Sequence, residues 1–191
     1  MDQNLIESTR QNSGFSLKSE IFDWIEIICF SVIAVILIFT FAFRSADVDG
    51  TSMYPTLNHS DKVLLVNTSV YKASAGDIVV VTQPTTVGNP IIKRIIATEG
   101  QTIDIDFEKG DVYIDGILIE EDYISELTTL KPHNAVEFPF TVSKGHVFVM
   151  GDNRNASTDS RDAGVGEIDT RYILGKAILR FYPFDAIKPL V

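Results

Sequence analysis

The sequence predicts a mainly β protein with one transmembrane helix near its N-terminus. A strongly apolar, uncharged run occupies residues 27–43. Seven short segments rich in Val, Ile, Phe or Tyr follow it and are separated by Gly, Pro, Asn and Asp, as expected for strands joined by turns. A chain of 191 residues is long enough for one compact domain with a buried core and an appendage.

The apolar run is predicted to be a membrane anchor. Its 17 residues would cover about 25 Å as a helix, slightly less than a bilayer core of roughly 30 Å. Extending the helix back to Ile21 supplies another turn and includes Trp24, a residue typical of membrane interfaces. A cleavable signal peptide and a buried core helix are the alternatives. The long, weakly basic preceding tail argues against the first, and the all-round apolar character against the second.

The anchor divides the chain into three predicted parts. Residues 1–20 are polar and are expected to be disordered, residues 21–43 span the membrane, and residues 44–191 form the folded domain. Arg10 and Lys18 precede the helix and Arg44 follows it. This slight excess of basic residues predicts a cytoplasmic N-terminus and an extracytoplasmic domain.

The domain is predicted to be all β. A hairpin turn is expected at Asp115-Gly116, between two short apolar pairs. The predicted strands cover residues 62–67, 78–82, 91–97, 102–107, 112–114, 147–150 and 177–182.

Composition excludes some functions. The formal net charge of -10 offers no electrostatic footprint for nucleic acid. The chain has one cysteine, Cys29, so an intramolecular disulfide is impossible. The three histidines are scattered along the chain without the spacing of metal ligands. No metal site is therefore expected.

Two segments carry candidate catalytic residues. Ser52 lies between Gly50 and Pro55, where the backbone can turn sharply; a surface turn is the alternative. Lys93 shares a strand face with Ile91 and Ile95. An apolar surrounding lowers the pKa of a lysine, and a neutral amine is a competent general base. The alternative is an edge strand protected by charges.

A third segment, Gly151–Gly164, is a dense polar loop after an apolar strand. A calcium loop was tested against its spacing and fails, because the third, sixth and twelfth positions hold Arg154, Ser157 and Ala163. A solvated hairpin loop is the remaining alternative.

In this order, these segments resemble the signature motifs of type I signal peptidases. The matching segments are Ser52–Leu57 (SMYPTL), Gly76–Val80 (GDIVV), Lys93–Ile96 (KRII) and Gly151–Arg161 (GDNRNASTDSR). The small insert and single anchor are similar to the compact Gram-positive form.

The resemblance implies a membrane-bound serine endopeptidase that removes signal peptides from exported preproteins and cuts after small residues. Its partners would be such preproteins, the lipid bilayer and the secretion machinery, with no cofactor. Ser52 would be the nucleophile and Lys93 its base, a variant of the usual serine protease chemistry.

The resemblance also implies supporting roles. Ser157 would orient the lysine, and the Ser52 N–H would bind the oxyanion. Gly50 stands where some members carry a serine that helps bind this oxyanion, so the second donor stays open. Ion pairs beneath the site are expected between Arg94 and Asp152 and between Asp159 and Arg161.

Two other functions were weighed. A self-cleaving repressor of the SOS type shares the Ser-Lys dyad, but the membrane helix and the lack of a preceding DNA-binding domain argue against it. A membrane-tethered β domain that only binds a partner would leave the co-occurrence of the polar loop with Ser52 and Lys93 unexplained.

Overall fold

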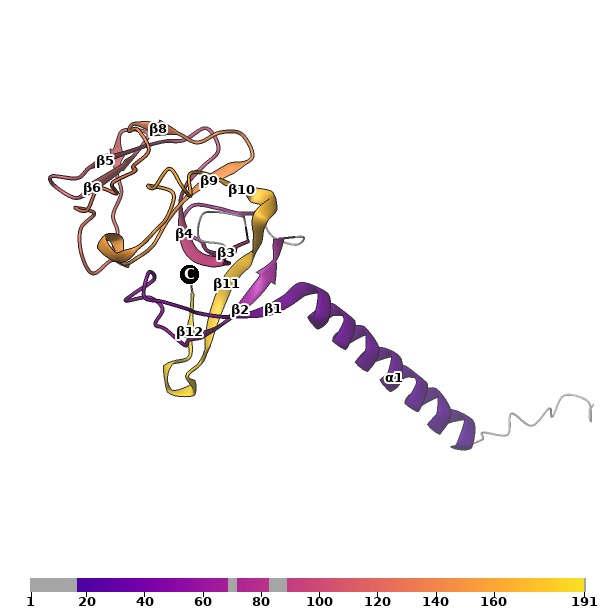
Figure 1. Ribbon diagram of the computed structural model, residues 1–191. Helices are drawn as coiled ribbons and strands as arrows, with labels where there is room; N and C mark the ends of the chain where they lie inside the picture. Colours follow the sequence, from indigo (N-terminus) through magenta and orange to yellow (C-terminus); the bar gives the residue numbers. More distant parts are fainter. Residues whose placement is uncertain (1–16, 69–71, 83–88, 191) are drawn as a thin grey trace, which may run out of the picture. The chain divides into compact units, whose positions relative to one another are not determined.

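The computed structural model describes residues 17–68, 72–82 and 89–190 and shows one long helix followed by a β domain (Figure 1). The chain divides into two compact units between Thr40 and Phe41, and each is described by itself. The predicted fold class, mainly β with one N-terminal apolar helix, is confirmed.

Helix α1 spans Leu17–Ala42, and its stretch Glu20–Ala42 is long and apolar enough to cross a membrane, with a mean hydropathy of 2.7. The predicted disorder is wrong for residues 17–20, which form the first turn of α1. Helix extension from an apolar segment costs little once the segment is helical. The rest of that prediction, residues 1–16, lies outside the described residues.

The β domain contains two antiparallel sheets. The large sheet has the order β1-β2-β11-β3-β4-β9-β10, with β12 paired to β11, and the small sheet has the order β7-β6-β5-β8. The strands of the large sheet are β1 (Phe43–Asp47), β2 (Lys62–Asn67), β3 (Ile78–Val81), β4 (Ile91–Thr98), β9 (His146–Met150), β10 (Ile168–Asp169), β11 (Ile173–Tyr182) and β12 (Lys188–Pro189). The strands of the small sheet are β5 (Thr102–Asp106), β6 (Asp111–Ile114), β7 (Ile117–Leu118) and β8 (Phe140–Thr141).

All seven predicted strands are present, and β7 completes the predicted hairpin with Asp115 and Gly116 at positive φ. The sequence analysis missed four short strands, β1, β8, β10 and β12, and the first four residues of β11. Strands of two residues carry too little period-2 pattern to be recognised, and β1 (FRSAD) is polar.

Three hydrophobic clusters hold the domain together. One cluster, which includes Phe148 and Met150 of β9, joins the large sheet to the small sheet. In Figure 1 the small sheet and the β1–β2–β11 part of the large sheet lie on opposite sides of β4 and β9. The other two clusters receive alternate residues of β3: Val80 enters one, and Val79 and Val81 enter the other. Both faces of strands β3 and β4 are therefore covered, and the side chains of these two strands are shielded from water.

Candidate active site

Ser52 lies in the loop between β1 and β2. The base of the loop is closed by two backbone hydrogen bonds, from the Val48 N–H to the Asp61 carbonyl and from the Ser60 N–H to the Val48 carbonyl. Met53 and Leu57 are buried in the hydrophobic cluster beneath it. Each such side chain contributes about 2 kcal/mol when removed from water. The nucleophile candidate therefore sits on a loop anchored at both sides.

Lys93 lies in β4, between β3 and β9, and its side chain is only 3% exposed. Its partner across the β3–β4 ladder is Val79. The same face of β4 carries Ile91 and Ile95, which pack in one cluster with Val79. The edge-strand interpretation of Lys93 is wrong, because β4 is paired on both sides.

The Nζ atom of Lys93 lies 2.8 Å from the Oγ atom of Ser52 and 3.0 Å from the carbonyl oxygen of Ile92. Burial lowers the pKa of Lys93 to about 8; the charge of Asp159 opposes this shift, and that of Arg161 adds to it. A serine hydroxyl and an amine that loses its proton near neutral pH are thus in direct hydrogen-bond contact. This arrangement can carry out nucleophilic catalysis with a general base.

The polar loop after β9 contacts the nucleophile loop directly. The Asn153 N–H donates to the carbonyl of Ser52 (3.0 Å), and the Asn153 side-chain amide donates to the carbonyl of Thr51 (3.1 Å). A Cβ atom at Gly151 would clash with the carbonyl oxygen of Ser52 and with Ser157. Glycine at position 151 therefore allows the two loops to approach closely.

Arg94 and Asp152 form a bidentate ion pair beneath the site. The Nε and Nη2 atoms of Arg94 donate to the two carboxylate oxygens of Asp152 at 2.8 and 2.7 Å, and both side chains are almost fully buried. Asp152 also accepts a hydrogen bond from the Thr56 hydroxyl in the nucleophile loop. The pair thus connects β4 to both loops that meet at Ser52.

Asp159 and Arg161 form a second buried, bidentate pair, with both distances 2.8 Å. Although burial opposes ionisation of Asp159, the hydrogen bonds from Arg161 and from the Gly151 N–H keep its pKa below the usual range. Asp159 is therefore an anion whose charge acts on Lys93. The pair also fixes Gly151 through the same carboxylate (2.9 Å).

Ser157 lies beside Gly151 of the polar loop, and Gly50 belongs to the nucleophile loop. The Ser157 Oγ is buried and forms no hydrogen bond with Lys93; it lies near enough to Asp159 to help lower the pKa of that carboxyl. Gly50 adopts a φ of 92°, which only glycine adopts freely, and its N–H donates to the Nδ1 of His59 (3.2 Å).

Sequence reasoning missed a third buried ion pair, between Arg154 in the polar loop and Glu121 in the segment after β7. It also missed the hydrogen bond from Thr56 to Asp152. No periodicity predicts these contacts, because residues 121–130 form neither a helix nor a strand. The only signal was Arg154, one of the two arginines in the polar loop and the one for which the sequence suggested no partner.

Comparison with known proteins decides the family. The family model described as "Signal peptidase, peptidase S26" matches residues 21–182. The chain belongs to this family. It is therefore a serine peptidase, a hydrolase that removes signal peptides from preproteins.

Two relatives from Bacillus agree with this assignment. The chain is 34% identical to signal peptidase I of Bacillus licheniformis over 90% of its own length and 94% of the relative. It is 37% identical to a signal peptidase I of Bacillus amyloliquefaciens over 96% and 98% of the two chains. A crystal structure of a signal peptidase I from Enterococcus faecalis V583 is 28% identical and covers 56% of this chain and 97% of its own, with a TM-score of 0.46.

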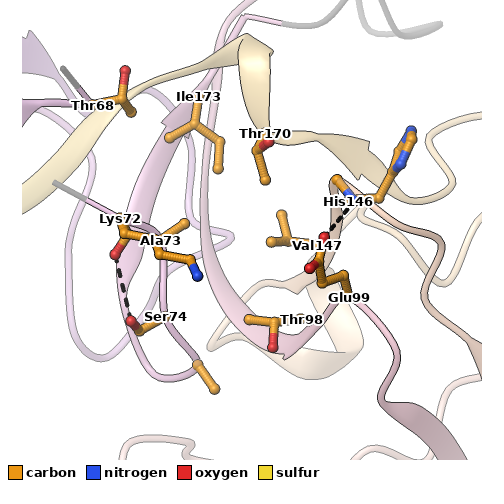
Figure 2. A pocket seen from close by; sticks show the side chains of 12 residues that line it. Thr68, Lys72, Ala73, Ser74, Thr98, Glu99, His146, Val147, Thr170 and Ile173 are labelled. Atoms are coloured by element: carbon orange, nitrogen blue, oxygen red, sulfur yellow. Dashed lines mark hydrogen bonds between the residues drawn. The ribbon is translucent and has the colours of Figure 1, made fainter.

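This signal peptidase also has a cavity of about 590 Å³ away from the dyad (Figure 2). Thr98 and Val147, which line it, are paired at the far end of β4 and β9 from Arg94 and Met150. Its Glu99 carboxylate already accepts the Gly145 N–H (2.7 Å). Within residues 17–68, 72–82 and 89–190, no group of three His, Cys, Asp or Glu side chains could hold a metal ion.

Proposed function

We propose that Ser52 is the nucleophile of this signal peptidase and that Lys93 is its general base. The observation that carries this proposal is the 2.8 Å contact between Lys93 Nζ and Ser52 Oγ, with Lys93 nearly fully buried. A base must lie within hydrogen-bond distance of the proton that it accepts, and its pKa must lie near the working pH. Lys93, with a pKa of about 8, meets both requirements.

The reaction begins when neutral Lys93 accepts the hydroxyl proton of Ser52. The Ser52 oxygen then attacks the scissile carbonyl, and a tetrahedral oxyanion forms. Protonated Lys93 gives its proton to the departing amine, which leaves with the mature protein. Lys93 next accepts a proton from water, and the resulting hydroxide attacks the ester carbonyl. Lys93 then returns this proton to the departing Ser52 oxygen, and the signal peptide is released as a carboxylic acid that ionises in solvent.

We assign the Ser52 N–H as a donor to the oxyanion. This N–H has no hydrogen-bond acceptor within the described part of the chain, so it is free to bind substrate. The Gly50 N–H is engaged by His59, and Gly50 has no side chain to offer. Gly50 therefore supports the oxyanion site through its backbone conformation, which places the turn that presents Ser52. The described structure has no hydrogen bond between His59 and Ser52; the Nδ1 of His59 accepts from the Gly50 N–H instead.

The proposed substrates carry small residues at the first and third positions before the cut. The similarity to bacterial signal peptidases supports this specificity. Replacing a small residue at the first position by a bulky one should reduce cleavage. Because exported preproteins arrive from the secretion machinery, association with that machinery is part of the proposal.

The apolar helix and the family membership indicate a membrane-anchored enzyme. We propose a single span over residues 21–43, with residues 1–20 in the cytoplasm and residues 44–191 outside it. The basic residues Arg10 and Lys18 support this orientation. Protease treatment of intact spheroplasts should degrade the domain, and degradation only after lysis would reverse the proposed orientation.

The central experiment measures cleavage of a purified preprotein by three variants. Ser52→Ala and Lys93→Ala should each abolish cleavage while circular dichroism shows the native fold. Lys93→Arg should also be inactive, because a guanidinium stays protonated. Near-native turnover by Lys93→Ala would show that another group is the base.

A further inference from the structure

The strongest unassigned feature near the site is the contact between the segment of residues 121–130 and the polar loop. We define this segment, which follows β7, as the strap. Arg154 of the polar loop is 1% exposed, and its guanidinium is held by the carboxylate of Glu121, with Nη1 2.7 Å from Oε2 and Nη2 bonded to Oε1. Arg154 also donates to the buried Thr128 hydroxyl (3.1 Å).

A second residue of the polar loop is also fixed by the strap. The Asn155 side chain accepts hydrogen bonds from the N–H groups of Thr129 (3.2 Å) and Leu130 (3.0 Å). Its amide nitrogen donates to Glu126 and to the carbonyl of Leu127, each at 3.2 Å. The side chains of two consecutive residues of the polar loop therefore bind the strap and not the dyad.

The Glu121–Arg154 pair reaches the catalytic residues in a short series of contacts. The Nε of Arg154 donates to the carbonyl of Gly151 at 2.9 Å. Gly151 lies against the carbonyl oxygen of Ser52 and against Ser157, so tightly that a Cβ atom would clash with both. A shift of Gly151 toward either neighbour would therefore displace the Ser52 carbonyl or Ser157.

The strap also touches the Arg94–Asp152 pair beneath the site. The Tyr123 hydroxyl donates to Oε1 of Glu121 (2.8 Å), and the Arg94 guanidinium lies 4.0 Å from the centre of the Tyr123 ring. Arg94 neighbours Lys93 in β4 and pairs with Asp152. Glu121 and Tyr123 thus contact both the polar loop and β4.

We propose that Glu121 is a positioning residue for signal-peptide cleavage, acting through Arg154 on Gly151 and so on the alignment of Ser52 with Lys93. This inference rests on the proposed Ser52–Lys93 dyad and adds a residue to it. A carboxylate suits the role because only a bidentate acceptor fixes both the position and the plane of a guanidinium. The strap then serves the reaction as well as the fold.

The test is Glu121→Gln in the full-length enzyme, assayed on a preprotein in detergent micelles. We expect kcat to fall about 10- to 100-fold, since a displacement near 1 Å can cost roughly 100-fold, while KM changes less than about twofold. Water admitted to a loosened site would relieve the desolvation of Lys93. The midpoint of the pH–rate profile should therefore move upward from about 8.

The matched control is Glu120→Gln, which makes the same charge change at the exposed neighbouring residue. It should keep the wild-type kcat and pH midpoint. Tyr123→Phe provides a milder second variant, because it removes the hydrogen bond to Glu121 and keeps the ring beside Arg94. It should show a smaller kcat loss and an upward midpoint shift. These measurements remain informative if Glu121→Gln folds poorly.

A double variant tests the route through Arg154. Arg154→Lys keeps the charge but cannot form the bidentate contact, and the loss in Glu121→Gln/Arg154→Lys should be close to that of the larger single variant. If instead the fold-losses in kcat of the two single variants multiply in the double variant, the two residues act independently and the proposed route is wrong. A lower melting temperature with unchanged kcat and pH midpoint in Glu121→Gln would show a merely structural role. Ser52→Ala, assayed in parallel, separates this failure from that of the dyad, since only a wrong dyad leaves that variant active.

Discussion

The Lys93 amine and the Ser52 hydroxyl are 2.8 Å apart, although 41 positions separate them in the chain. Ser52 comes from a loop anchored by Met53 and Leu57, and Lys93 comes from a strand covered on both faces. The loop supplies access for a substrate, and the strand supplies the low polarity that lowers the pKa of the amine. The contact therefore joins a residue on an accessible loop to a residue in an apolar interior, and the reaction needs both.

The first prediction concerns the pH dependence of cleavage. Lys93 must be neutral to accept the Ser52 proton, and burial lowers its pKa to about 8. The rate of preprotein cleavage, kcat/KM, should therefore fall about tenfold per pH unit below 8 and level off above it. Steady-state assays between pH 6 and 10 measure this profile. A rate independent of pH over that range is incompatible with Lys93 as the base.

The second prediction concerns stability. The pKa of Lys93 is lower in the folded than in the unfolded state, so folding opposes its protonation. Below pH 8 this penalty is present in full, on the order of 3 kcal/mol, and it disappears as the pH rises from 8 to 10.5. Lys93→Met, which removes the charge and keeps the volume, should therefore unfold at a higher temperature than the wild type at pH 7.

Thermal unfolding of the wild type and of Lys93→Met at pH 7 and pH 10 checks this reasoning. The difference between the two proteins should shrink at the higher pH. Equal stability at pH 7 would mean that the lysine is not destabilised by its surroundings. Such an inactive but more stable variant is expected where a catalytic group is held in an unfavourable environment.

The third prediction concerns Ser157. Its buried hydroxyl forms no hydrogen bond with Lys93 in the described structure and lies beside Gly151 and the Ser52 carbonyl. If it accepts a hydrogen bond from Lys93 during the reaction, Ser157→Ala should lower kcat by about 10- to 1,000-fold with KM nearly constant. Single-turnover cleavage measures the step directly.

The control for Ser157 follows from the structure. Ser160, a hydroxyl in the same loop, accepts the Val149 N–H (3.0 Å) and is fully buried, so its removal would disturb β9. Thr158 is exposed and neighbours Ser157. Thr158→Ala should cleave at the wild-type rate. Similar rates for the Ser157 and Thr158 variants would remove Ser157 from the mechanism.

The fourth prediction concerns the Arg94–Asp152 pair. Asp152→Ala leaves a buried guanidinium without its carboxylate and should destabilise the domain by about 3–5 kcal/mol. Denaturant unfolding measures the loss. The comparison is Asp47→Ala, which breaks the exposed pair with Lys62 and should cost less than about 1 kcal/mol. Equal losses in the two variants would show that burial of the Arg94 pair has no effect on its strength.

The sequence by itself determined those features that depend on neighbours in the chain. The apolar run predicted α1, because a helix must be uniformly apolar to suit a bilayer. The alternation in β4 predicted that Lys93 shares a face with Ile91 and Ile95, because side chains alternate along a strand. The hairpin at Asp115 and Gly116 was predicted because its turn requires positive φ.

Only the tertiary structure decided which of these local features meet. The pairing of β4 with β3 and β9 is a long-range choice that no local pattern encodes, and it turned Lys93 from a candidate edge charge into a buried amine. The Glu121–Arg154 contact joins an irregular segment to an irregular loop, where no periodicity exists to read. Ser157 lies beside Gly151 and the Ser52 carbonyl, and which hydrogen bonds its hydroxyl forms depends on side-chain positions that no local pattern encodes. The lowered pKa of Lys93 and the bidentate Glu121–Arg154 pair depend on the local environment of these side chains. That environment forms only after segments distant in the sequence have packed together.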